Sequence, residues 1–219
     1  MTMESIRTPH PYFPENLVLD HYVPNTNSVF LTLSYVSITF IFITLVTIAL
    51  GYPKRHSCLS SIGDRLAFFW FILCVFLHIF FEGYFGLYHK TLAGDNSPVA
   101  QVWKEYALSD SRYLSSDTFV LIAELVTIII WGPLALFNAW STYHNLPSRH
   151  IGQLILSLGQ VYSCTLYYFT SIVEGSPECR PEPYYYYFYF WFFNAFWMVA
   201  PVILIKNSIK TLYNAMAQL

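Results

Sequence analysis

The segment LAFFWFILCVFLHIFFEGYF, residues 66–85, decides the fold class. Its first part, up to residue 77, contains no ionisable side chain, and His78 and Glu82 then follow four positions apart. A helix that crosses a bilayer needs about 20 mostly apolar residues, and this segment has that length. Protein cores and bilayers both penalise buried charge. We therefore predict a membrane-spanning helix in which the His–Glu pair has a function.

The composition of the whole chain favours a membrane protein. Its 219 residues are 55% hydrophobic and 20% aromatic, and only 11% are charged, whereas soluble domains carry about 25% charged residues. The net charge is −2 without a block of basic residues, so nucleic acid is not an expected partner. The four cysteines show neither C-x-x-C spacing nor the spacing of a disulfide framework.

Five windows are long and apolar enough to span a bilayer. They are residues 29–50, 66–88, 118–140, 151–173 and 184–205. We therefore predict an all-α membrane protein, a multi-pass bundle of five transmembrane helices that forms one domain over residues 1–219. Between the second and third windows lies a polar loop whose Trp103, Tyr106 and Tyr113 suit the surface of the lipid bilayer.

Three ionisable side chains fall at depth within these windows: His78, Glu82 and Glu124. A charged residue at a helix centre costs about 2.5–3.5 kcal/mol, and the default explanation is a functional site. The second and third windows run in opposite directions, which puts both carboxyl groups about 7–8 Å from the midplane on the same side. His78 and Glu82 are one turn apart and share a helix face.

Each of these positions has a partner on its own face. Glu124 shares a face with Thr127 and Trp131, and Asn194 pairs with Trp197 near the middle of the fifth window. If these faces point inward, they form a polar chamber covered by aromatic rings.

Several roles are compatible with such a chamber. A buried hydrogen-bond clip between helices is one, although such clips usually use Ser, Thr or Asn. His78, Glu82 and Glu124 are also possible metal ligands, but a membrane di-iron site needs more histidines at depth, so no metal is expected. Proton chemistry fits better. A carboxyl group in a dry cavity stays protonated at neutral pH and acts as an acid, His relays protons, and Trp stabilises a cation. These groups suit the isomerisation of a carbon–carbon double bond through a carbocation, without a cofactor.

Motifs along nearly the whole chain resemble the emopamil-binding protein family, the sterol Δ8–Δ7 isomerases of the endoplasmic reticulum. The matching stretches, in order, are HPYFPENLVLDHYVPN (10–25), HIFFEGYF (78–85), VWKEYALSDSRY (102–113), SDTFVLIAELVTIIIWGPLAL (116–136), LGQVY (158–162) and FWFFNAFWMVAPVILI (190–205).

The resemblance implies a set of catalytic and binding residues. The catalytic set is His78, Glu82, Glu124, Asn194 and Trp197. The implied reaction is protonation at sterol C9, a C8 cation shielded by Trp197, and loss of a proton from C7. We expect the two glutamates and His78 to carry the protons, with Asn194 orienting Glu124. The candidate substrate-binding residues are Thr127, Tyr106, Tyr113 and Trp131.

The expected partners follow from the same resemblance: a sterol or related polycyclic lipid as substrate, cationic amphiphilic amines as inhibitors, and a second copy of the chain in a homodimer. The expected location is the endoplasmic reticulum membrane. The chain departs from the family pattern at Cys164, where an acidic residue is expected, and in the aromatic run at 184–193. These departures leave two alternatives open: the same proton chemistry on another terpenoid, or a non-catalytic sterol-binding or escort protein.

Overall fold

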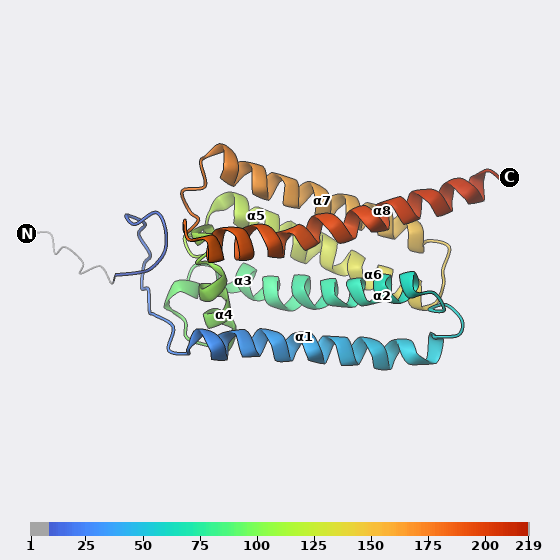
Figure 1. Cartoon of the computed structure of the whole chain (residues 1–219), viewed down its shortest axis with the longest axis horizontal. Coiled ribbons are helices and arrows are strands. Elements are labelled where there is room, and N and C mark those ends of the chain that lie inside the picture. Colours follow the sequence, from blue (N-terminus) through green and yellow to red (C-terminus); the bar gives the residue numbers. More distant parts are fainter. Residues whose placement is uncertain (1–8, 219) are drawn as a thin grey trace, which may run out of the picture.

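The computed structural model describes residues 9–218, which fold into a bundle of helices (Figure 1). The α-helices are α1 (Val29–Gly51), α2 (Ile62–Val75), α3 (Glu82–Tyr88), α4 (Pro98–Tyr106), α5 (Thr118–Val126), α6 (Gly132–Tyr143), α7 (Arg149–Val173) and α8 (Asn194–Met216). Wider π-helical turns form η2 (Phe76–Phe81), η5 (Thr127–Trp131) and η6 (Tyr184–Phe193). Short 3₁₀ turns form η1 (Tyr52–Lys54), η3 (Leu92–Gly94) and η4 (Ser111–Tyr113). No strand occurs in residues 9–218.

The π-helical turns join the shorter helices into long continuous ones. These run over Ile62–Tyr88, Thr118–Tyr143 and Tyr184–Met216, beside α1 and its extension Val29–Lys54. All four are long and apolar enough to cross a membrane. When α7 is counted with these four, the helices run alternately in opposite directions along the bundle, so the N-terminal segment and the C-terminus lie at opposite ends (Figure 1).

The window predicted at residues 151–173 also folds as a helix, α7, but it does not reach the same apolarity. The reason is its inward face, where Gln153, Ser157 and Gln160 are buried against the other helices. Its outward face carries exposed aliphatic and aromatic side chains such as Ile155 and Leu158. The polar residues therefore point into the bundle and the apolar residues point away from it, the reverse of a water-soluble helix.

Helix boundaries are set by caps that hydropathy does not detect. The second long helix begins at Ile62, four residues before the predicted window, because the Ser61 hydroxyl accepts a hydrogen bond from the Asp64 amide at 3.0 Å. The Asp117 carboxylate caps α5 in the same way through the Val120 amide. α8 continues to Met216, past the predicted end at 205.

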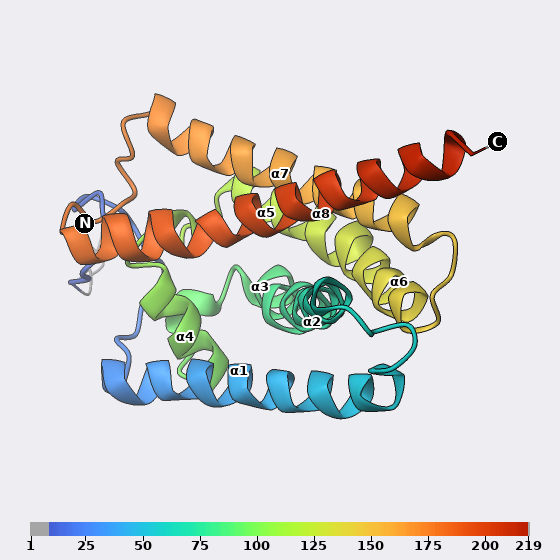
Figure 2. The same ribbon diagram turned by 45° about the vertical axis from the view of Figure 1, so that its right-hand side comes forward.

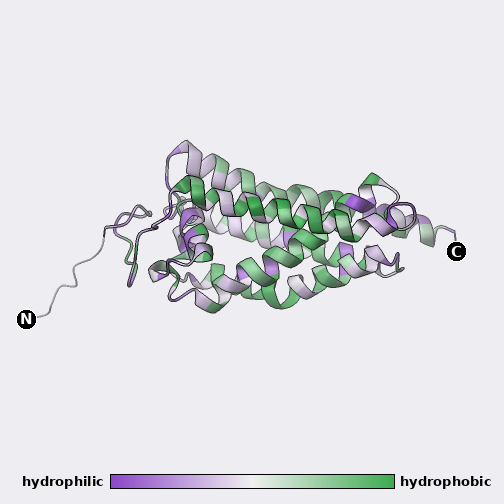
Figure 3. Ribbon diagram, turned by 90° about the horizontal axis from the view of Figure 1, so that it is seen from below, coloured by the Kyte–Doolittle hydropathy of each residue, from purple (hydrophilic) through white to green (hydrophobic). Residues whose placement is uncertain are grey.

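The interior divides into two hydrophobic clusters. One lies towards the end that carries α4 and includes Phe85, Trp103 and Phe190. The other lies towards the opposite end and includes Phe71, Leu156 and Leu204. Hydrophobic residues dominate the long helices and hydrophilic residues gather in the connecting segments at the two ends (Figure 3). Exposed aliphatic and aromatic side chains over the outer faces suit contact with lipid.

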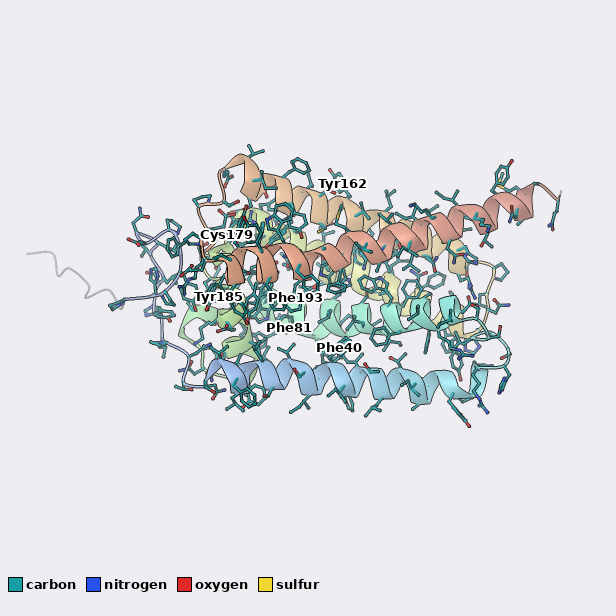
Figure 4. All side chains as sticks on the ribbon, viewed as in Figure 1. Phe40, Phe81, Tyr162, Cys179, Tyr185 and Phe193 are labelled. Atoms are coloured by element: carbon teal, nitrogen blue, oxygen red, sulfur yellow. The ribbon has the colours of Figure 1, made fainter. Side chains whose placement is uncertain are left out.

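The end of the bundle that carries α4 is covered by a layer of connecting segments. α4 packs between α1 and the ends of the other helices (Figure 2). Residues 9–27 lie over α4: the Tyr12 hydroxyl donates to the Lys104 carbonyl at 3.1 Å, and the Asn27 amide donates to Gln101 Oε1 at 2.8 Å. Cys179 and Tyr185, from the connection between α7 and α8, lie at the same end (Figure 4).

Candidate active site

Three π-helical segments position the candidate residues. His78 lies in η2, and Glu82 begins α3 directly after it. Thr127 begins η5, and Asn194 begins α8 directly after η6. A π turn is wider than an α turn and is frequent at functional sites. Because η2 packs against η5, the wide turns of two neighbouring helices meet inside the bundle.

His78 and Glu82 form a buried pair. The His78 side chain is 3% exposed and that of Glu82 is 13% exposed. His78 Nδ1 lies 2.8 Å from Glu82 Oε2, the contact that a spacing of four residues allows. The carboxyl group of Glu82 is also close enough to interact with that of Glu124 on the neighbouring long helix. The pair can therefore exchange a proton with an adjoining carboxyl group.

Glu124 is held by a tyrosine from the loop. The Tyr113 hydroxyl donates a 2.9 Å hydrogen bond to Glu124 Oε1, and the Tyr113 side chain is buried. Tyr113 lies in η4, so the loop contributes directly to the arrangement of the carboxyl groups.

The hydrogen bonds of Asn194 go to Phe190 and Tyr106. Its Nδ2 donates to the Phe190 carbonyl at 2.8 Å, and the Tyr106 hydroxyl lies 3.3 Å from its Oδ1. The Tyr106 and Tyr113 rings are 5.3 Å apart. Asn194 is therefore linked to Tyr106, and Glu124 to Tyr113. The expected role of Asn194 in orienting Glu124 stays a prediction.

Trp197 joins the two hydrophobic clusters at the level of the His–Glu pair. Its ring lies 5.1 Å from the His78 ring and 5.1 Å from the Trp70 ring. It is partly buried and packs against both clusters. An electron-rich indole face therefore lies beside the acid–base residues.

The remaining two candidates are Thr127, which bonds within its own helix, and Trp131, which contacts a neighbouring helix. The Thr127 hydroxyl donates to the Ala123 carbonyl of its own helix at 2.9 Å. Trp131 lies against Gly159 of α7, so closely that a Cβ on Gly159 would be 2.5 Å from the indole ring. Trp131 thus packs between the third long helix and α7.

Gln160 is a residue that the sequence did not single out. It is 4% exposed, and its Nε2 lies 3.3 Å from His78 Nε2, on the side of the ring opposite Glu82. Trp70 donates from its indole Nε1 to Gln160 Oε1 at 3.4 Å. The available signal was the polar stripe Gln153, Ser157 and Gln160 on one face of α7. Uncharged polar side chains of this kind are common at contacts between membrane helices, so the sequence alone gives the stripe no specific role.

A buried ion pair anchors the loop that carries the two tyrosines. Arg112 contacts Asp110 at 2.7 Å and donates to the Thr170 hydroxyl of α7 at 3.1 Å. Burial alone would lower the pKa of Arg112, but the hydrogen bonds and charge of Asp110 outweigh it and hold that pKa above its ordinary value. Arg112 therefore stays charged and fixes η4 to α7.

The chemical groups that meet in the site suit acid–base chemistry. Within residues 9–218, no group of three or more His, Cys, Asp or Glu side chains is arranged to hold a metal ion. The groups brought together are one imidazole, two carboxyl groups, tyrosine hydroxyls and an indole.

Comparison with known proteins identifies the family. The family profile described as EBP, EXPERA (expanded EBP superfamily), matches residues 98–208. The 3-beta-hydroxysteroid-Delta(8),Delta(7)-isomerase of Mus musculus is 40% identical over 214 residues, which is 96% of this chain and 91% of that protein. The chain belongs to the EBP superfamily. The predicted resemblance to the emopamil-binding protein family is thus confirmed.

The similar proteins include some named as isomerases and others named as synthases. The 3-beta-hydroxysteroid-Delta(8),Delta(7)-isomerase of Cavia porcellus is 37% identical over 94% of this chain and 90% of that protein. A protein of Citrus sinensis named protoglabretal synthase is 34% identical over 64% of this chain and 67% of that protein. The prediction of an isomerase therefore agrees with the names of the mammalian relatives.

Proposed function

We propose that this protein is a membrane isomerase that moves a sterol double bond from Δ8 to Δ7. The observation that carries the proposal is the buried His78–Glu82 pair, close to the Glu124 carboxyl group and next to the Trp197 ring. The mammalian relatives named as Δ8,Δ7-isomerases cover nearly the whole chain and support the same reaction.

The reaction requires one proton to be added and another to be removed. A carboxylic acid of the site protonates C9, and the electrons of the C8–C9 double bond form the new C9–H bond. The positive charge on C8 lies against the face of Trp197, where a cation–π contact stabilises it. A carboxylate of the site takes the C7 proton, and the electrons of that C–H bond form the C7–C8 double bond. The donor ends with one proton fewer and the acceptor with one more, so a proton that passes back from acceptor to donor restores the site, and the cycle uses no cofactor.

The membrane setting is part of the proposal. We infer that α7 crosses the bilayer with the four more apolar helices, because its polar face points inward and its apolar face outward. Five spans would place the site within a bilayer, where a sterol reaches it from the lipid, and from the family resemblance we propose that this bilayer is the endoplasmic reticulum membrane. Cationic amphiphilic amines would compete by placing an ammonium at Trp197 in place of the C8 cation. A homodimer is part of the proposal on the family resemblance alone, because Gly152 and Gly159 of α7 pack against Asn138 and Trp131 of the same chain.

A related terpenoid is the second candidate substrate. The observation that favours it is the similarity to plant proteins named protoglabretal synthase and isomeliandiol synthase, at 33–34% identity. The acid–base residues would be used in the same way on a different ring system. Cys164, whose thiol lies 3.5 Å from the Asn194 carbonyl, would be part of a substrate cavity wall that differs from that of the sterol isomerases.

The test uses purified protein in nanodiscs with a Δ8 sterol in deuterated water. We expect a Δ7 product that carries one deuterium, and a loss of at least about 100-fold in rate for Glu82→Gln and for Glu124→Gln. Glu174→Gln is the matched control, because Glu174 is exposed at the end of α7. A folded wild type that binds the sterol without converting it would rule out the sterol reaction, and a terpenoid panel would then separate the second candidate from a binding protein.

A further inference from the structure

His78 makes a contact at each of its two ring nitrogens. Nδ1 lies 2.8 Å from Glu82 Oε2, and Nε2 lies 3.3 Å from Gln160 Nε2. Both contacts are inside the bundle, where the His78 and Gln160 side chains are 3% and 4% exposed. Buried polar groups need partners of the correct donor or acceptor type. The protonation state of His78 is therefore limited by what Gln160 presents to it.

The orientation of the Gln160 amide is fixed by Trp70. An indole N–H can only donate a hydrogen bond. Trp70 Nε1 lies 3.4 Å from one end of the amide, which must therefore be the carbonyl oxygen. The other end is the NH₂ group, and it faces both His78 Nε2 and the Cys74 sulfur, each at 3.3 Å. Reversing the amide would bring its NH₂ group against the indole N–H and leave two donors facing each other.

An amide NH₂ group is also only a donor, so the nitrogen opposite it must accept. His78 Nε2 is then without a proton, and the proton of the neutral ring lies on Nδ1. From Nδ1 it is donated to Glu82. A doubly protonated imidazolium would place a second N–H against the Gln160 NH₂ group at 3.3 Å.

We propose that Gln160, held by Trp70, is the positioning residue that keeps His78 in the neutral form protonated at Nδ1. In this form His78 donates to Glu82 and stabilises the Glu82 carboxylate, while Gln160 itself does not touch the substrate. The catalytic consequence rests on the proposed isomerase, whereas the protonation state of the ring is a property of the resting protein and is tested without substrate.

The surroundings of His78 explain why such a device is needed. On its own long helix the titratable neighbours are Glu82 and Cys74, and from the third long helix the neighbour is Glu124. α7 and α8 contribute Gln160 and Trp197, which do not titrate. Two carboxyl groups on one side would otherwise favour the imidazolium form. Gln160 opposes it by presenting a donor on the other side.

The first test measures directly which nitrogen of the His78 ring carries a proton. The protein contains seven histidines, and the ¹⁵N resonances of His78 are assigned in histidine-labelled protein by their absence from His78→Asn. We expect a protonated Nδ1 and an unprotonated Nε2 at neutral pH. In Gln160→Glu, whose carboxylate accepts at that position, we expect a protonated Nε2. Trp70→Phe, which frees the amide to turn, should give a mixture of forms. A wild-type ring protonated at Nε2 would overturn the proposal.

The second test uses kinetics with a matched control. Gln153 is another buried glutamine on α7, but its amide binds the Leu204 carbonyl and Ser208 and does not contact His78. We expect Gln160→Glu to lower kcat about tenfold or more at neutral pH, with KM nearly unchanged and activity recovered at higher pH. Gln153→Leu should leave the shape of the pH profile unchanged even where it lowers stability. Equal pH profiles for wild type and a folded Gln160→Glu would contradict the proposal. If the wild type converts no Δ8 sterol, the ¹⁵N result still decides the protonation state.

Discussion

Tyr113 connects the loop at the end of the bundle to the carboxyl groups inside it. Its hydroxyl donates to Glu124 at 2.9 Å, and the adjoining Arg112 fixes the loop to α7 through Thr170. A hydrogen bond to a carboxylate favours the charged form over the protonated one. Tyr113 therefore influences which of the two neighbouring carboxyl groups holds the proton.

Tyr113→Phe removes only this hydroxyl. A buried hydrogen bond contributes about 0.5–1.5 kcal/mol, so we expect the isomerisation rate to fall roughly 2- to 10-fold with little change in KM. The measurement is the rate of Δ7 product formation, with Tyr187→Phe as control because Tyr187 is 63% exposed. A Tyr113→Phe enzyme as fast as the control would mean that Glu124 is oriented by other contacts.

The third long helix and α7 approach each other closely at two glycines. A Cβ on Gly159 would be 2.5 Å from the Trp131 ring, and one on Gly152 would be 2.4 Å from Asn138 Oδ1. Both distances are too short for any side chain without movement of the helices. These two glycines allow α7 to approach closely enough for Gln160 to reach His78.

Gly159→Ala tests this close contact. We expect a loss of about 1–3 kcal/mol in stability from overpacking, measured as a lower Tm in nanodiscs, together with reduced activity. Gly63→Ala is the control because the nearest atom to its Cβ would be 3.7 Å away, and alanine favours helix over glycine by about 1 kcal/mol. If both substitutions had the same effect on Tm, the contact between the third long helix and α7 would not depend on a glycine at position 159.

The long helices were predictable because hydropathy over about 20 residues reports burial in lipid, whatever the neighbours are. The depth of His78, Glu82 and Glu124 followed from the same windows. Other features depend on contacts between segments distant in the sequence. The π-helical turns are one example, and the pairing of Asn194 with Tyr106 is another. Gln160 belongs to this group, since only the folded bundle brings it to His78.

At the scale of the whole molecule, a buried lysine provides one of the links between the N-terminal segment and α4. Lys104 Nζ donates to the Val23 carbonyl at 2.8 Å and to Asn96 Oδ1 at 2.6 Å, and the side chain is 0% exposed. Burial lowers the pKa of Lys104 from 10.5 to about 8, although the charge of Asp95 opposes this. The layer of connecting segments that covers the α4 end of the bundle therefore depends on an amine that titrates in an accessible pH range.

The direction of this pH dependence follows from proton linkage. Between about pH 8 and pH 10.5 the unfolded chain binds the Lys104 proton and the folded chain does not, so stability rises with pH in this window. The cost of burying the ammonium is present in full below about pH 8 and is relieved above it. Lys104→Met removes the titration together with the two hydrogen bonds.

We therefore expect Lys104→Met to be less stable than the wild type at every pH, with a difference that widens from pH 8 to pH 10. The measurement is the fraction of folded protein left after heating across this range, compared between the two proteins so that other titrating groups cancel. A difference that stayed constant would show that Lys104 keeps an ordinary pKa in the folded protein. A difference that narrowed would show that the folded state favours the charged amine, and that this layer is held to the bundle by charge.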